Sequence, residues 1–152
     1  MLDAYESVFE YRGLTCAVWF GKNGVRIGNV LIPTGHPWHG IDGNKTMIDC
    51  HGGCWCAGEL GMLKGWFVWF DCGHLHDRPD LDAMPEGLEK EFAREHSDPC
   101  GTLWTCAMVE RECRRVADQV IAAATPAADP LDLAGFVKRA LSGPTTDSDP
   151  RD

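Results

Sequence analysis

The sequence predicts an α+β fold, in which a mainly antiparallel sheet is covered by one long C-terminal helix and accompanied by shorter helices. Two observations predict this class. Segments rich in strand-forming residues fill the first half of the chain, whereas helical periodicity is confined to the second half. Strands followed by helices, without the regular alternation that builds parallel sheets, are typical of α+β proteins.

Four strands are predicted from composition and spacing. Residues 14–20 (LTCAVWF) and 25–32 (VRIGNVLI) flank the turn sequence GKNG, so we expect a hairpin, with Gly28 at a bulge. Residues 65–72 (GWFVWFDC) contain five consecutive large apolar residues, as expected of a strand in the interior of a sheet. Residues 45–51 alternate between two faces, which predicts a further strand.

The helices are predicted from apolar spacing and capping residues. Residues 105–124 repeat apolar side chains every three or four positions, which indicates a helix with one buried stripe. Residues 85–96 are expected to form a short acidic helix, and the Asp-Pro pair that opens residues 129–141 can cap a last one. We expect a single domain over residues 1–141 and a disordered tail over residues 142–152.

The chain is acidic, and its charge restricts the classes of partner. Its 152 residues include 14 Lys and Arg against 23 Asp and Glu, a net charge of −9. Nucleic acids and anionic membranes are bound through basic residues, so we expect neither partner. The first residues carry acids and no long apolar run, which argues against a secretory signal. We therefore expect a cytoplasmic protein whose cysteines stay reduced.

Cysteines and histidines are concentrated between residues 49 and 77. This stretch holds four of the eight cysteines and three of the six histidines. If the strand at residues 65–72 continues, alternate residues from Cys72 to His76 project from one face. Two short ligand pairs brought together by a hairpin would form a tetrahedral zinc site. The ligands expected for zinc are Cys72, His74, His76, Cys54 and Cys56.

Other interpretations of this stretch stay open. Cys50 and Cys72 can fill the core while His74 and His76 lie on a polar loop. In a catalytic arrangement, Gly52-Gly53 would let the backbone approach a ligand, Asp71 would orient a histidine, and Cys72 would serve as a thiolate nucleophile. Aspartates can instead hold a hard cation such as Mg²⁺. The candidates for that cation are Asp71, Asp77, Asp80 and Asp82.

A second segment of interest is the loop at residues 33–43, which is dense in glycine, proline and histidine. Its histidine and tryptophan side chains can form the lip of a binding site, or the loop can be a packed Ω-type loop. The polar ligand pocket expected from both segments consists of His36, His51, Asp71, His74 and Asp77.

Several short motifs occur in a defined order along the chain. They are R-G-L-T-C at residues 12–16, G-H-P-W at 35–38, D-x-H-G-G at 49–53, F-D-C-x-H at 70–74, Asp77, and E-C-x-x-x-A at 112–117. Together they resemble an uncharacterised family of small proteins encoded by bacteriophages, chiefly those of actinobacteria, over roughly residues 11–119.

The resemblance implies a phage accessory protein that works in the host cytoplasm. The positions that match family motifs are His51, Asp71, Cys72, His74 and Asp77. The chain departs from the family at Cys54 and Cys56, where an H-G-G-L-T type of run is more common. This departure shifts the emphasis from a cysteine-based zinc site to a smaller polar site of histidines and aspartates.

Three functions are consistent with these observations. The first is binding of a host protein or a small charged ligand through the polar pocket. The second is metal-dependent hydrolysis of a nucleotide or phosphoester by the same histidines and aspartates. The third is a zinc-stabilised module that interacts with a protein. The sequence contains no recognised catalytic motif that decides whether the protein is an enzyme.

Overall fold

The computed structural model describes residues 5–124, and it has an α+β architecture with one mainly antiparallel sheet. The sheet has five strands in the order β1-β2-β3-β5-β4, and each neighbouring pair is antiparallel. The strands are β1 (Tyr5–Tyr11), β2 (Leu14–Phe20), β3 (Arg26–Ile32), β4 (Cys56–Glu59) and β5 (Trp66–Asp71).

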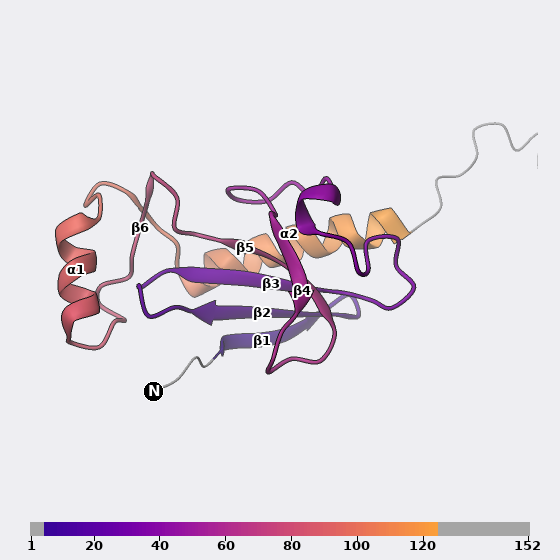
Figure 1. Cartoon of the computed structure of the whole chain (residues 1–152), viewed down its shortest axis with the longest axis horizontal. Coiled ribbons are helices and arrows are strands. Elements are labelled where there is room, and N and C mark those ends of the chain that lie inside the picture. Colours follow the sequence, from indigo (N-terminus) through magenta and orange to yellow (C-terminus); the bar gives the residue numbers. More distant parts are fainter. Residues whose placement is uncertain (1–4, 125–152) are drawn as a thin grey trace, which may run out of the picture.

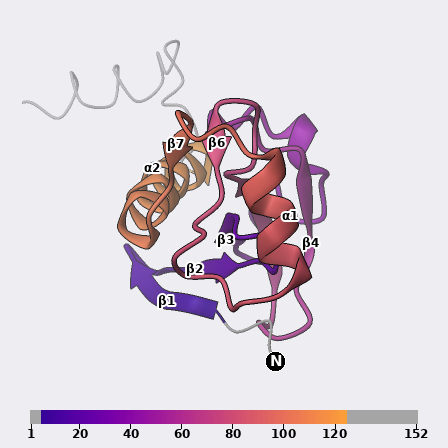
Figure 2. The same ribbon diagram turned by 90° about the vertical axis from the view of Figure 1, so that its left-hand side faces the viewer.

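The remaining elements include the longest helix, which follows the strands as predicted. Figure 1 shows this helix, α2, running along one face of the sheet, with α1 beyond one end of the strands. Figure 2 shows two very short strands, β6 and β7, between α1 and α2. The elements are the short 3₁₀ helix η1 (Gly43–Lys45), β6 (Asp77–Arg78), α1 (Leu88–His96), β7 (Thr102–Leu103) and α2 (Cys106–Ala124).

The core lies between the sheet and α2. The predicted apolar stripe of this helix is buried at Val109, Cys113, Val116 and Val120, which pack against β1, β2 and β3. Ala124, the last residue of the stripe, is exposed at the end of the helix. A helix in a protein owes most of its stability to such packing of its apolar face, so the sheet is what holds α2 in place.

The interior position of β5 is confirmed. It pairs with β3 on one side and β4 on the other, and Phe67, Val68 and Phe70 are almost fully buried. Gly28, expected at a bulge, instead lies in regular register between Val18 and Phe70. A side chain at this glycine would overlap the Phe70 ring, so close packing explains the residue.

The first strand, β1, was not predicted from the sequence. Its side chains alternate between half-buried and exposed, with Phe9 and Tyr11 packed against the core. The alternation of Tyr5, Ser7, Phe9 and Tyr11 is the available signal, but acidic residues between them give the segment a polar composition.

The strand predicted at residues 45–51 is absent, although its alternation is real. Thr46, Ile48 and Cys50 point into the protein, whereas Met47 and Asp49 are exposed. The segment begins as η1, and Met47 has a positive φ of 60°, which a regular strand does not allow. Its backbone is bonded to side chains of α2 instead of to another strand.

The predicted helices differ in outcome. The helix over residues 105–124 is confirmed as α2, and the short acidic helix begins three residues later than expected, as α1. Pro85 and Gly87 precede its first turn, which accounts for the later start. The helix predicted at residues 129–141 and the tail at 142–152 lie outside the described residues.

Candidate metal centre

His51 is placed by the contacts of the preceding residues with α2. The side-chain amide of Gln119 accepts from the Asp49 N–H at 2.9 Å and donates to the Asp49 carbonyl at 2.7 Å. The His51 N–H donates to Glu112 Oε1 at 2.8 Å. Arg115 then links Asp49 to Glu112 through its guanidinium. Hydrogen bonds from Arg115, opposed by burial and assisted by the His51 N–H, lower the pKa of Glu112.

The chain turns sharply after His51 at two glycines. Gly52 and Gly53 have positive φ values of 66° and 91°, and the Gly53 N–H donates to the Cys50 carbonyl at 3.0 Å. A Cβ atom at Gly52 would overlap the imidazole ring of His74. We predicted that these glycines would let a ligand approach the backbone closely. The group that does so in the structure is the His74 ring.

A disulfide connects the two ends of this turn. It joins Cys50 to Cys54, whose Cα atoms lie 6.1 Å apart, a separation typical of disulfides. The expectation that all cysteines stay reduced is wrong for this pair. Both side chains are buried and face the core, because the turn at Gly52-Gly53 brings them to the same side of the chain.

Asp77 and His74 are brought together at the end of β5. The strand ends at Asp71, and the chain then forms a tight turn in which the Asp77 N–H donates to the His74 carbonyl at 2.8 Å. The His74 N–H donates back to Asp77 Oδ2 at 2.9 Å. Asp77 opens β6, which pairs in parallel with β7, and Trp104 directly follows β7.

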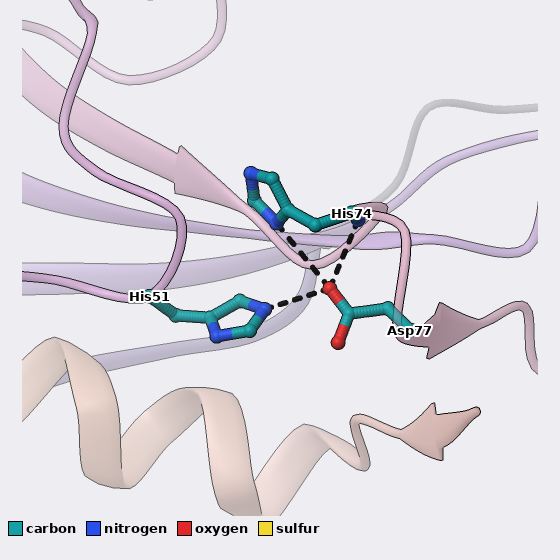
Figure 3. A group of neighbouring side chains, drawn as sticks. All are labelled: His51, His74 and Asp77. Atoms are coloured by element: carbon teal, nitrogen blue, oxygen red, sulfur yellow. Dashed lines mark hydrogen bonds and ion pairs between the residues drawn. The ribbon is translucent and has the colours of Figure 1, made fainter.

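Three side chains converge on one point, as Figure 3 shows. Asp77 Oδ2 lies 2.7 Å from His51 Nε2 and 3.3 Å from His74 Nδ1. The two imidazole rings meet edge to face, with centroids 5.0 Å apart. All three ligand atoms lie within 4.8 Å of one another. His51, His74 and Asp77 can therefore hold a metal ion, and in the described residues they are the only group of three that meets this distance criterion.

The Asp77 carboxylate is buried and strongly hydrogen bonded. Its side chain is only 3% exposed, and its second oxygen accepts from the Trp104 indole N–H at 2.9 Å. Burial alone would raise the pKa of Asp77, but the hydrogen bonds from His51, the His74 N–H and Trp104 outweigh it and hold the pKa below its usual range. The carboxylate is therefore ionised at neutral pH and available as a ligand.

The indole of Trp104 also fixes one of the imidazoles. The His51 and Trp104 rings lie with their centroids 4.1 Å apart. Together with the Glu112 bond to its backbone, this contact restricts the orientation of His51. Trp104 and Glu112 were not among the predicted site residues. Trp104 has no sequence signal, because only a parallel pair of two-residue strands brings it to Asp77.

The five residues predicted as zinc ligands are not gathered in one group. Because the chain bends after β5, Cys72 points into the core, His74 into the site, and His76 to the surface. Cys54 forms a disulfide with Cys50, and Cys56 is an exposed free thiol on β4. Burial, reinforced by nearby carboxylates, raises the pKa of Cys72 well above its usual range, so it is unsuited to act as a thiolate nucleophile.

The predicted polar pocket is brought together in part. His51, His74 and Asp77 converge, and Asp71 lies at the margin with its carboxylate 3.9 Å from His74 Nε2. His36 lies elsewhere, buried against the C-terminal half of α2. Its Nδ1 accepts from the Trp38 N–H at 2.9 Å, so its Nε2 carries the proton and donates to the Val120 carbonyl at 2.8 Å.

Of the aspartates predicted for a hard cation, Asp80 is engaged elsewhere. It bonds Arg26 at 2.9 Å, and Asp82 is exposed. Asp71 and Asp77 are separated by the turn that holds His74 between them. The donors that converge are therefore two nitrogens and one oxygen, which favours a transition metal over Mg²⁺.

A cleft of ≈ 960 Å³ adjoins the metal centre. His74 and Asp77 line it, so the candidate ligands form part of its wall. The β2–β3 turn, the segment from Gly73 to Pro79, and α1 with the residues that follow it form the other walls.

Comparison of the chain with known protein families, with curated proteins and with solved structures finds no match. The resemblance to small phage proteins therefore stays a prediction from the motifs. In the part of the chain that the structure describes, none of the helices combines the length and apolar character needed to cross a membrane.

Proposed function

We propose that this protein binds a divalent transition metal at His51, His74 and Asp77 and uses it in hydrolysis. The observation that carries the proposal is the convergence of two imidazole nitrogens and a buried, ionised carboxylate at the wall of a cleft. Zinc at catalytic sites takes three such protein ligands and keeps a further position for water. Two histidines and a carboxylate also suit non-haem iron. Elemental analysis of the purified protein distinguishes zinc from iron.

The surrounding residues support this assignment. Metal-ligating histidines usually donate their second nitrogen to a carboxylate or carbonyl. His74 directs Nδ1 towards Asp77 and Nε2 towards Asp71, 3.9 Å away, so Asp71 is placed to accept from that nitrogen after a small rotation. The Trp104 indole holds the other oxygen of Asp77, which leaves Oδ2 as the ligand atom.

The proposed chemistry follows from these positions. A zinc ion lowers the pKa of a bound water to about 7, which provides a nucleophile at neutral pH. The His51 side chain is about a quarter exposed and that of His74 about a third, whereas Asp77 is buried. The site is therefore open to solvent on the side of the two histidines. A substrate in the cleft would meet that water at His74.

Binding without turnover is the second proposal, and the cleft itself favours it. The space beside the metal centre is large enough for a small ligand, whether or not the metal activates water. Action as a phage accessory protein, on a host protein or a small charged ligand, remains compatible with both proposals. Turnover of a substrate by the zinc-loaded protein, abolished by a chelator, separates them.

The metal site is tested by replacing each histidine. His51→Ala and His74→Ala should each lose stoichiometric zinc, because two ligands do not complete a site, whereas the wild type should retain about one zinc per chain after dialysis. His76→Ala is the matched control, since His76 lies two residues from His74 but on the surface. Elemental analysis gives the zinc content, and circular dichroism checks the fold. Equal zinc in all four proteins would contradict the assignment.

The Gly52 turn offers a second test of the same geometry. Gly52→Ala should weaken zinc binding about 10- to 100-fold, as expected when the support of a ligand is disturbed, because the added methyl group displaces the His74 ring. Gly35→Ala is the control, because Gly35 has a similar positive φ of 84° but nothing within 4 Å of its Cβ position.

Both glycine substitutions should cost about 1–2 kcal/mol of stability from backbone strain. Competition with a chromogenic chelator measures the zinc affinity. If the two variants bind zinc equally well, the contact between Gly52 and His74 does not matter to the site.

A further inference from the structure

The cleft beside the metal centre has an unusually apolar surface. Seven large apolar side chains are exposed in residues 5–124, and three of them line this cleft. Leu88 and Phe92, one helical turn apart on α1, are 84% and 64% exposed, and Leu75 is 85% exposed. Apolar side chains gathered in a concave site, rather than scattered singly, mark a place where a ligand binds.

The charges of the cleft are distributed unevenly. On α1, Glu89, Glu91 and Glu95 line the cleft, whereas Lys90 and Arg94 of the same helix do not. Lys90 is directed away and bonds Glu86 at 2.6 Å and the Met84 carbonyl at 3.3 Å.

The three glutamates have no salt-bridge partner among the ion pairs of the described residues, so their charges remain available to a ligand. The α1 wall is therefore anionic as well as apolar. It would repel a phosphate group and attract a cation placed next to an apolar group.

The lining of the cleft also includes the metal ligands His74 and Asp77 and two cations, Lys22 and Arg78. A ligand that spans the cleft would present a polar, electron-rich group to the metal and to these cations. Its other part would meet the apolar and acidic face of α1. A peptide has both parts, because its carbonyl oxygens are electron-rich and its side chains can be apolar and basic.

We propose that the cleft binds a short peptide segment in which basic and apolar side chains are neighbours, with a backbone carbonyl at the metal. This inference deepens the proposed function and rests on it for the position of the reacting group. Hydrolysis would join the oxygen of a water, activated by the metal that these residues would hold, to the carbonyl carbon. The C–N bond would break and both protons of the water would end on the departing nitrogen, leaving a carboxylate and a protonated amine.

The test uses two labelled peptides and the full-length, zinc-loaded protein. The basic probe is Phe-Arg-Leu-Lys-amide and the control probe is Phe-Glu-Leu-Glu-amide, each with the same fluorophore on its N-terminus. Fluorescence anisotropy should show that the basic peptide binds at least about tenfold more tightly, and that added salt reduces the difference. Equal binding of the two peptides, or tighter binding of the acidic one, would overturn the inference.

Variants locate the binding surface. Glu91→Gln and Glu95→Gln should each weaken binding of the basic peptide about two- to fivefold, as expected for exposed charge pairs, and Phe92→Ala should weaken binding of both peptides. Glu59→Gln makes the same charge change on β4, outside the cleft, and should have no effect. If Glu59→Gln weakens binding of the basic peptide as much as the two cleft variants do, the affinity depends on net charge alone. That result would refute the cleft as the binding site.

The two proposals fail in distinguishable ways, because zinc content is measured on the same samples. Stoichiometric zinc without preference for the basic peptide would reject the peptide class and leave the metal centre standing. A preference for the basic peptide in protein that retains no zinc would support the cleft and reject the metal centre.

Discussion

Asp77→Asn is expected to reduce zinc affinity by about 100-fold or more, because it replaces the one anionic ligand of the proposed centre with a neutral amide. The substitution preserves the size of the side chain. Its amide oxygen can still accept from either the Trp104 indole or the His74 N–H, so the fold should survive. The loss of charge removes the main attraction for a cation in a position that is only 3% exposed.

Asp71→Asn is the matched control for this experiment. Asp71 lies three residues before His74 in the sequence, whereas Asp77 lies three residues after it. The Asp71 side chain is 53% exposed. As an outer partner of His74 that is half exposed and 3.9 Å away, it should alter zinc affinity by about tenfold, the lower end of the effect of such partners. Isothermal titration with zinc measures both variants. If Asp77→Asn binds zinc as tightly as Asp71→Asn, the carboxylate of Asp77 is not a ligand.

Arg26→Met is expected to destabilise the protein by about 3–5 kcal/mol, the usual cost of removing one partner from a buried ion pair. Arg26 is 5% exposed and makes two bonds to Glu6, at 2.6 and 2.8 Å. Nη1 donates to Asp80 and to the Trp104 carbonyl, both at 2.9 Å. Hydrogen bonding to Glu6, against the opposing effect of burial, raises the pKa of Arg26 further above its usual range.

Loss of the guanidinium should therefore affect β1, β3 and the metal centre together. Arg26 donates to the Trp104 carbonyl, and the Trp104 indole donates to Asp77, so Trp104 links Arg26 to the metal centre. Arg12→Met is the control. Arg12 pairs with Asp118 at 2.6 Å, but both side chains are about half exposed, so its loss should cost less than about 1 kcal/mol.

Urea unfolding of both arginine variants gives the two free energies. Adding Glu6→Gln and Asp80→Asn to Arg26→Met should recover part of the stability, because no unpaired charge then remains. Similar small losses in Arg26→Met and Arg12→Met would contradict a structural role for the buried pair.

The fold was largely predictable because its elements leave strong patterns in the sequence. The stripe of α2 and the apolar run of β5 are set by burial, and burial is visible as periodicity. The segment at residues 45–51 shows the limit of that approach. Its alternation indicates which side chains are buried, but it does not reveal that Gln119 and Glu112, rather than a strand, bond its backbone.

The sequence indicated the residues of the candidate site but not which of them come together in the structure. The concentration of cysteine and histidine marked the correct stretch, and His51, His74 and Asp77 all lie within it. The predicted zinc site included cysteines because the strand spacing was extended past Cys72, whereas β5 ends at Asp71. The bend after that residue begins with the Gly73 N–H donating to Asp71 Oδ1 at 3.0 Å, a local turn signal that the strand spacing ignored. The bond from the His74 N–H to Asp77 then completes the turn.

X-ray absorption at the zinc edge of the loaded protein tests the metal centre most directly, because it distinguishes nitrogen and oxygen ligands from sulfur. The structure predicts a first shell of nitrogen and oxygen only, at about 2.0–2.1 Å, with the outer scattering of two imidazoles. A sulfur contribution at about 2.3 Å would place the metal on cysteines instead and would contradict a centre made of His51, His74 and Asp77.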